Sequence, residues 1–161
     1  MIENSQTTDE VQIRLLLDEF RNLLQVKDSD RIMSLYSPEI VVFDMPPPLQ
    51  RVGSKAYGKA VLEWFDSYRD PISFETRDLS IAVGADVAFS HSLIRTSGNM
   101  KSGQDLDRWQ RWTLCLRRIS GKWLITHEHV SLPVDQKSGN AVQDLKPQRI
   151  WLISSLRQTT S

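Results

Sequence analysis

The sequence is poor in cysteine and carries no excess charge of either sign. Cys115 is its only cysteine, which excludes a disulfide within the chain, and its place in the apolar run WTLCL favours a small buried residue over a nucleophile. Lys plus Arg and Asp plus Glu both number 20, so no net field would gather nucleic acid or an anionic membrane. We therefore expect neither as a partner.

Long apolar runs are also missing. The first residues, MIENSQTTDE, lack the basic start and the apolar stretch of a secretory signal, and no later run approaches the roughly 20 residues that span a bilayer. We therefore expect a cytoplasmic protein. Its 161 residues, 40% hydrophobic and 25% charged, suit one globular domain with a single core.

The first third of the chain has the spacing of helices. Apolar residues at helical intervals predict a helix over 8–26, and Asp28 can cap a second one that runs to Tyr36 and is ended by Pro38. The run IVVFDM at 40–45 then predicts a buried strand, which must leave the sheet at the three prolines that follow. A third helix is predicted to start at Ser54 and to close at Asp70 with Pro71.

The period of the pattern changes after this helix. Four stretches rich in β-branched and aromatic residues predict strands at 72–83, 86–98, 107–119 and 122–134. The order predicts an α+β fold, with helices packed on one face of a mainly antiparallel sheet. We expect one domain over residues 1–135. Residues 136–161, with an apolar cluster at 150–156, form an extension that caps the pocket, docks on a partner subunit or is a frayed tail.

Asp44 stands where the first strand ends. Side chains alternate along a strand, so Asp44 and Phe43 point in opposite directions and one of them must face inward. A carboxylate held against apolar walls has a raised pKa, which is how an aspartate becomes a general base near neutral pH. Asp44 is therefore the candidate catalytic base. The alternative is that it only caps the turn into the prolines, a common use of Asp.

All three histidines fall inside predicted strands. His127 and His129 share one face of the last strand, opposite to Glu128, and buried polar side chains need partners. The pattern indicates a polar cavity in which His127 is catalytic and His91 and His129 bind ligand; the alternative is histidines satisfied within the core. With Asp44 they also offer the ligand types of a metal site, but this spacing arises easily by chance, and we expect no metal or other cofactor.

The strand at 107–119 has one face that is more apolar than the other. Trp109 and Arg111 lie on the less apolar face and are expected to look toward the polar cavity, where the guanidinium could hold a carboxylate or enolate oxygen of a ligand. A surface salt bridge is the alternative for Arg111. Aromatic residues near and on the helices, among them Tyr36 and Trp64, are helix core or, at most, walls of the pocket.

With these residues in view, the chain resembles the SnoaL-like and ketosteroid isomerase-like branch of the nuclear transport factor 2-like superfamily over about residues 8 to 135. LYSPEIVVFDMPP resembles the family's segment in which a helix ending in Leu-Tyr or Leu-Phe leads into a strand finishing in Asp-Pro. RRISGKWLITHEHVSLP resembles the closing hairpin, and is similar to the final strand of the association domain of calcium/calmodulin-dependent kinase II, which assembles through its sheet. The resemblance implies a cone, in which a strongly bent, mainly antiparallel sheet and three N-terminal helices surround a pocket.

The resemblance also marks two differences from the ketosteroid isomerases. By an ungapped count, Asp44 falls where these enzymes carry their general base. Their oxyanion-binding tyrosine would fall at Phe20, which has no hydroxyl, and their second donor, a protonated aspartate, near Thr113, where no carboxylate exists. We therefore do not expect steroid isomerase activity.

The sequence thus predicts a small-molecule enzyme, namely an isomerase, cyclase, dehydratase or hydrolase. Asp44 would move a proton beside a carbonyl or on a ring, and His127, with His91 or Arg111, would stabilise the oxyanion. The alternative, favoured by the missing donors, is a non-catalytic ligand-binding or assembly module of the same fold. A homodimer is expected, because the strands carry more apolar surface than three helices can cover.

Overall fold

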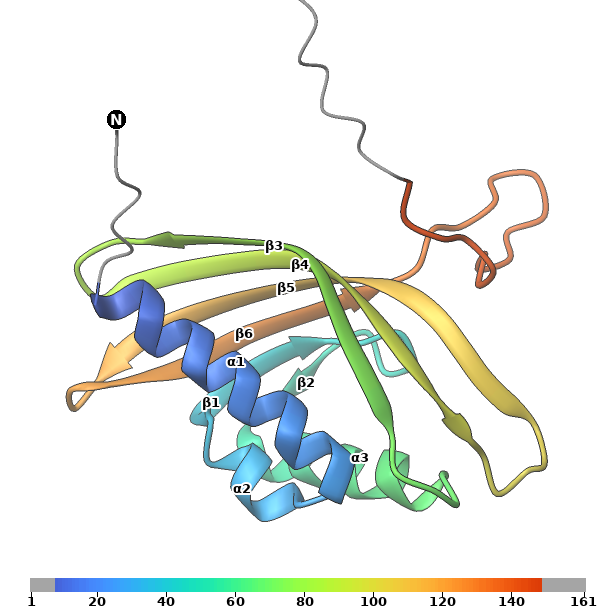
Figure 1. Ribbon diagram of the computed structural model, residues 1–161, viewed down its shortest axis with the longest axis horizontal. Coiled ribbons are helices and arrows are strands. Elements are labelled where there is room, and N and C mark those ends of the chain that lie inside the picture. Colours follow the sequence, from blue (N-terminus) through green and yellow to red (C-terminus); the bar gives the residue numbers. More distant parts are fainter. Residues whose placement is uncertain (1–7, 149–161) are drawn as a thin grey trace, which may run out of the picture.

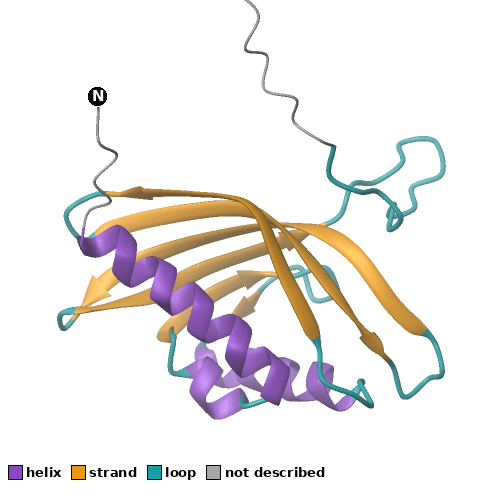
Figure 2. Cartoon of the chain, viewed as in Figure 1, coloured by secondary structure: helices purple, strands orange, loops and turns teal. Residues whose placement is uncertain are grey.

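The computed structural model describes residues 8–148, which form three helices and one six-stranded sheet (Figure 1). The helices lie on one side of the sheet, here called its inner face, and the opposite side is called its outer face (Figure 2). The elements are α1 (Thr8–Val26), α2 (Ser29–Met33), β1 (Tyr36–Phe43), β2 (Arg51–Val52), α3 (Ser54–Asp66), β3 (Ser73–Val83), β4 (Val87–Asn99), β5 (Asp105–Ile119) and β6 (Lys122–Ser131).

The sheet has the strand order β2-β1-β6-β5-β4-β3. β1 runs parallel to β6, and every other neighbouring pair is antiparallel. The turn between β5 and β6 consists of Ser120 and Gly121, both with positive φ, as a two-residue hairpin loop requires. The predicted α+β fold, with helices on one face of a bent and mostly antiparallel sheet, is therefore confirmed.

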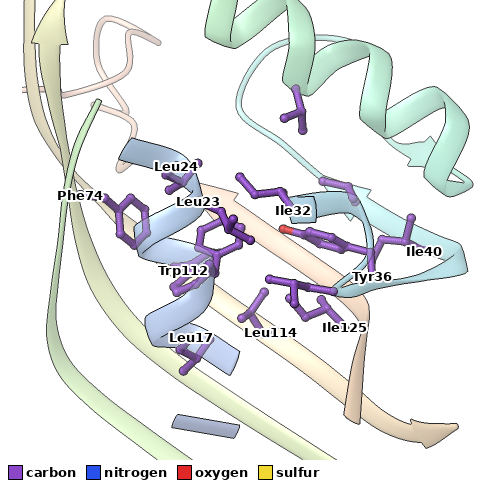
Figure 3. Close-up of a cluster of buried hydrophobic side chains, with 14 of the residues drawn as sticks. Leu17, Leu23, Leu24, Ile32, Tyr36, Ile40, Phe74, Trp112, Leu114 and Ile125 are labelled. Carbon is purple, nitrogen blue, oxygen red and sulfur yellow. The ribbon is translucent and has the colours of Figure 1, made fainter. Parts of the chain in front are cut away.

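The core fills the space between α1 and the inner face of the sheet. α1 runs across the inner face of the bent sheet and packs against β3 (Figure 1). Phe20 of its apolar stripe contacts both Phe74 of β3 and Trp112 of β5. In Figure 3, Leu17, Leu23 and Leu24 of this helix lie beside Trp112 and Leu114 of β5. Such burial of apolar side chains is the main driving force that holds a helix on a sheet.

The second helix is shorter than predicted. The side chain of Asp28 does cap it, by accepting the backbone N–H of Arg31 at 3.0 Å. The helix ends at Met33, however, and both Tyr36 and Pro38 belong to β1. Pro38 is tolerated in a strand because the register between β1 and β6 is irregular at this position, so its missing N–H interrupts no regular ladder.

No helix of residues 8–148 combines the length and the apolar character needed to cross a bilayer. After β6 the chain continues in an irregular segment, in which Asp135 accepts backbone N–H groups of Lys137 and Ser138. The predicted apolar cluster at 150–156 lies outside the described residues.

Candidate functional site

A cavity of about 470 Å³ lies between α1, α3 and the inner face of the sheet. This volume is in the range of pockets that bind small organic molecules, and the wall has their usual composition, mostly apolar with a few polar groups. The apolar wall includes Phe20, Leu24, Trp64, Phe74, Ile94, Trp112 and Val130. The polar groups include Asp44, Tyr57, Thr96, Arg108, Gln110 and Glu128.

Glu128 of β6 lines this cavity and is only 3% exposed. Its Oε2 accepts the hydroxyls of Tyr36 at 2.7 Å and Tyr57 at 2.9 Å, and its Oε1 accepts the indole N–H of Trp112 at 2.6 Å. The donors come from β1, α3 and β5, so one carboxyl group links three separate elements. Figure 3 shows Tyr36 with its hydroxyl directed into the interior of the core.

The surroundings of this cluster shift the pKa of each acid in it. Burial raises the pKa of Glu128 above its usual range; its three hydrogen bonds oppose the shift, and the nearby charge of Asp44 adds to it. Burial, together with the Glu128 carboxylate, raises the pKa of Tyr36 and of Tyr57 well above the ordinary value. The tyrosines therefore remain protonated donors, and Glu128 holds a proton at a higher pH than a carboxyl group in water does.

Asp44 follows β1 directly and forms a partly exposed piece of the cavity wall. Its Oδ1 accepts the backbone N–H of Met45 at 2.8 Å, and its Oδ2 lies 3.7 Å from Nη1 of Arg51. The carboxylate thus caps the turn and also lines the cavity, so the two interpretations of Asp44 from the sequence are compatible in one residue. Its charge is close enough to act on Glu128 and Tyr57.

Gln110 and Arg108 lie two residues apart on the inner face of β5. The Thr96 hydroxyl donates to Oε1 of Gln110 at 2.9 Å, which directs the amide Nε2 toward the sulfur of Met45 at 3.3 Å. Burial lowers the pKa of the Arg108 guanidinium, and the charge of Asp44 opposes that shift. This side of the cavity therefore presents hydrogen-bond donors.

The three histidines do not line the cavity. His91 and His129 are exposed on the outer face, where Phe43 packs edge-on against the rings of His127 and His129. His127 donates from Nδ1 to the carbonyl of Val41 at 2.8 Å. The structure thus brings Asp44 together with Glu128 rather than with the imidazoles. His127 has a structural contact instead, because its hydrogen bond links β6 to β1.

A β-bulge in β6 explains this arrangement. The register of β6 against β5 shifts at Thr126, whose hydroxyl donates to the carbonyl of Cys115 at 3.2 Å. Before the bulge the odd-numbered Ile125 is buried, and after it the even-numbered Glu128 is buried. A regular strand would have continued the alternation from Ile125 and turned both histidines of β6 inward, whereas the extra residue exchanges the two faces.

The remaining predicted ligand-binding residues divide between two places. Trp109 and Arg111 line a separate small hollow of about 110 Å³, together with residues 145–147 of the segment that follows β6. Trp64 lines the main cavity. Tyr36 is not part of its wall but donates to Glu128, which is. Of these four residues, Trp64 thus belongs to the cavity wall and Tyr36 supports a residue of that wall, whereas Trp109 and Arg111 lie elsewhere.

The structure offers no ligand set for a metal within residues 8–148, where no three side chains of His, Cys, Asp and Glu come together. The alternative of a metal site built from Asp44 and the histidines is contradicted, because Asp44 lines the inner cavity whereas the imidazoles lie on the outer face.

Glu128, Arg108 and Gln110 were not predicted as functional residues from the sequence. The sequence did contain an indication for Arg108 and Gln110, which lie on the more apolar face of β5. Arg108 and Gln110 share that face with Trp112, and polar residues on an otherwise apolar face mark a pocket or a satisfied polar cluster. Glu128 carried no comparable sign, because its direction depends on the bulge.

Known proteins share the sequence pattern and the fold of this chain. A model of the family described as the SnoaL-like domain matches residues 13–135. A crystal structure of an NTF2-like protein of unknown function from Pseudomonas putida is 31% identical, with a TM-score of 0.80 over 88% of this chain and 99% of that chain. The comparison with curated proteins found no match.

Two more distant structures share the fold alone. A ketosteroid isomerase-like protein from Erwinia carotovora is 17% identical, with a TM-score of 0.67 over 78% of this chain and 97% of its own. A provisionally named scytalone dehydratase from Novosphingobium aromaticivorans is 14% identical, with a TM-score of 0.68 over 76% of this chain and 82% of its own. The family model, the 31% identical relative and the observed architecture agree, and the chain belongs to the SnoaL-like domain family, with the NTF2-like fold.

Proposed function

We propose that this protein is an enzyme acting on a small carbonyl-containing or cyclic substrate, with Asp44 as the general base. The observation that carries the proposal is the pair of carboxyl groups, Asp44 and Glu128, at one apolar cavity in contrasting surroundings. Asp44 is partly exposed and lies beside Arg51, whereas Glu128 is buried. Environments that differ in this way divide two carboxyl groups into a base and an acid.

In this proposal the ionised Asp44 removes a proton from the substrate. Glu128, whose pKa is raised by burial, returns a proton or gives one to a leaving hydroxyl group. The oxygen on which negative charge develops lies among the donors of this cavity. His127, His91 and Arg111, which the sequence predicted for this task, do not line it.

Isomerisation, cyclisation and dehydration all share this proton transfer, and in hydrolysis the same base would activate water. The names of the two distant structures, a ketosteroid isomerase-like protein and a provisionally named scytalone dehydratase, fall in this range of reactions. The missing hydroxyl at Phe20, which lines the cavity, argues against steroid isomerisation by the mechanism of the ketosteroid isomerases.

The test is a screen of cyclic ketones, enones and β-hydroxyketones with wild type, Asp44→Asn and Asp44→Glu. We expect Asp44→Asn to lose roughly a hundredfold to ten-thousandfold in kcat, the usual contribution of a general base, and Asp44→Glu to keep measurable activity. Asp144→Asn, an exposed aspartate beyond β6, is the matched control. Equal rates for wild type and Asp44→Asn contradict a catalytic role.

A second candidate function is a non-catalytic ligand-binding module. Its support is that both oxygens of Asp44 have partners in the protein, Met45 and Arg51, so the residue has a structural task without any substrate. Thermal shift measurements against a metabolite panel separate the candidates. Binding without turnover favours the module, and turnover rejects it.

We also propose that the outer face of the sheet pairs two copies of the chain. In the described residues the helices all lie on the inner side of the sheet (Figure 2). On the outer side Phe43 is 39% exposed and Phe89 is 50% exposed. Exposed apolar side chains in one area are a common mark of a subunit interface. A pair of identical sheet faces also satisfies the two-fold symmetry of most homodimers.

A further inference from the structure

The charged side chains around the main cavity differ in whether they have a partner of opposite charge or hydrogen-bond donors within the protein. Among its acids, Asp44 lies 3.7 Å from Arg51, Glu63 lies 4.0 Å from Lys59, and Glu128 is satisfied by three neutral donors. Of its two arginines, Arg51 also donates to the backbone carbonyl of Pro47.

Arg108 is the exception. In residues 8–148 no carboxylate lies within 4.0 Å of its guanidinium, and its Nε is buried without a hydrogen-bond partner. The far end of the group is held by Gln143, whose Oε1 lies 3.4 Å from Nη1. Arg108 lines the main cavity, and its cation has no anionic partner there among the described residues, so the cavity is a place for a negatively charged acceptor from outside the protein.

Gln110 points to the same kind of ligand. It is two residues from Arg108 on the same face of β5, and Thr96, which pairs with Arg108 across the sheet, fixes its amide through Oε1. The amide Nε2 then has the Met45 sulfur as its acceptor, and a thioether accepts only weakly. A ligand oxygen would be a stronger acceptor for this N–H group.

We propose that Arg108 and Gln110 form a carboxylate-binding subsite, so that the ligand of the main cavity is a small carboxylic acid with an apolar body. The guanidinium matches the planar carboxylate, and the amide adds a second donor. The body of the ligand lies against Phe20, Phe74 and Trp112, in a volume of about 470 Å³. Within the described part of the chain, Arg108 is the one arginine of this cavity without a carboxylate partner, and Asp44 is nearby, which favours a ligand with one negative charge over the two of a phosphate ester.

This inference deepens the proposed function, because it rests on the same cavity and names the class of its substrate. It does not require catalysis. Arg108 anchors the acid, and Asp44 would act on another atom of the bound molecule.

The experiment uses two probes of equal shape, 2-naphthoate and its neutral analogue 2-naphthamide, with the full chain and isothermal titration calorimetry. We expect wild type to prefer naphthoate. Arg108→Gln should weaken naphthoate binding roughly 10- to 100-fold, the range for a hydrogen bond to a charged group, while naphthamide binding stays within about twofold. Arg108→Lys, which keeps the charge, should retain part of the preference.

Arg111→Gln is the matched control, because Arg111 lies on the same strand but on its outer face. Circular dichroism melting shows whether Arg108→Gln is folded, and Arg108→Lys supplies the comparison if it is not. The proposal is overturned if wild type binds naphthoate no better than naphthamide, if neither binds at millimolar concentration, or if Arg108→Gln weakens both probes equally.

Asp44→Asn separates this proposal from the proposed function. We expect it to bind naphthoate at least as tightly as wild type, because a nearby negative charge is removed. If Asp44→Asn turns over substrate as fast as wild type while Arg108→Gln still loses naphthoate selectively, catalysis by Asp44 fails and the carboxylate subsite stands.

Discussion

The hydroxyl of Tyr57 donates to Oε2 of Glu128 at 2.9 Å, although 71 residues separate the two in the chain. The bond joins α3 to β6 at the wall of the main cavity. Tyr36 and Trp112 complete the set of donors around the same carboxyl group. Structure and candidate chemistry therefore depend on one buried acid, and variants of Glu128 affect both.

Removal of this acid should destabilise the protein strongly. Glu128→Ala leaves three buried donors without an acceptor, each of which costs about 1–3 kcal/mol when unsatisfied. We expect the free energy of unfolding in urea to fall by about 3 kcal/mol or more. Glu39→Ala, at an exposed position of β1, is the control and should change it by less than about 0.5 kcal/mol. A loss below about 1 kcal/mol for Glu128→Ala would contradict the hydrogen-bonded cluster.

The stability of the protein should depend on pH in the direction set by the raised pKa of Glu128. Its pKa in the folded protein is raised above the unfolded value of 4.5, so the folded state binds the proton more tightly than the unfolded state does. Stability from this group is complete below pH 4.5 and is lost as the pH rises through the folded pKa.

Urea unfolding of wild type and Glu128→Gln, measured from acidic to mildly alkaline pH, tests this sign. The amide keeps the shape of the side chain but does not titrate. We expect the free energy of unfolding of wild type, relative to the variant, to decline as the pH rises above 4.5. A relative stability that grows with pH would mean that the hydrogen bonds outweigh burial and that the pKa is lowered.

His127 should prove structural. His127→Ala removes the bond from Nδ1 to the Val41 carbonyl, and a single hydrogen bond of this kind contributes about 1 kcal/mol to stability. We therefore expect a small loss in the free energy of unfolding and unchanged turnover of any substrate found in the screen. If turnover falls as far as in Asp44→Asn, the catalytic role predicted from the sequence would be supported after all.

The proposed homodimer predicts a species of twice the 18.5 kDa chain mass in sedimentation at micromolar concentration. Phe89→Glu places a charge on the outer face of the sheet and should shift the protein toward monomer. Leu62→Glu is the control, since Leu62 is also exposed but lies on α3, away from that face. A wild-type protein that sediments only at 18.5 kDa would exclude the dimer.

Local patterns in the sequence predicted most of the elements. The helix over 8–26 has the observed bounds, and the four later strands lie within about two to three residues of the predicted ranges. The end of the second helix was predicted too late, because the two residues before Pro38 enter β1 instead. The short strand β2 was not predicted at all, since a two-residue strand has no period to detect.

The candidate site was predicted only in part. Asp44 and Trp64 do line the cavity, as their positions in the elements suggested. The face of β6 could not be derived by alternation, because one extra residue at Thr126 reverses it. Without that knowledge Glu128 appeared to face away and the histidines inward.

The sequence by itself determined the order of helices and strands, because spacing, capping and turn residues act over a few neighbours. Only the tertiary structure decided which side chains meet. Tyr36 and Glu128 are 92 residues apart, and Asp44, which follows β1, reaches the same cavity as Arg108 of β5. Their proximity depends on the bend of the sheet and on a single bulge, which are consequences of packing across the whole domain rather than of any local pattern.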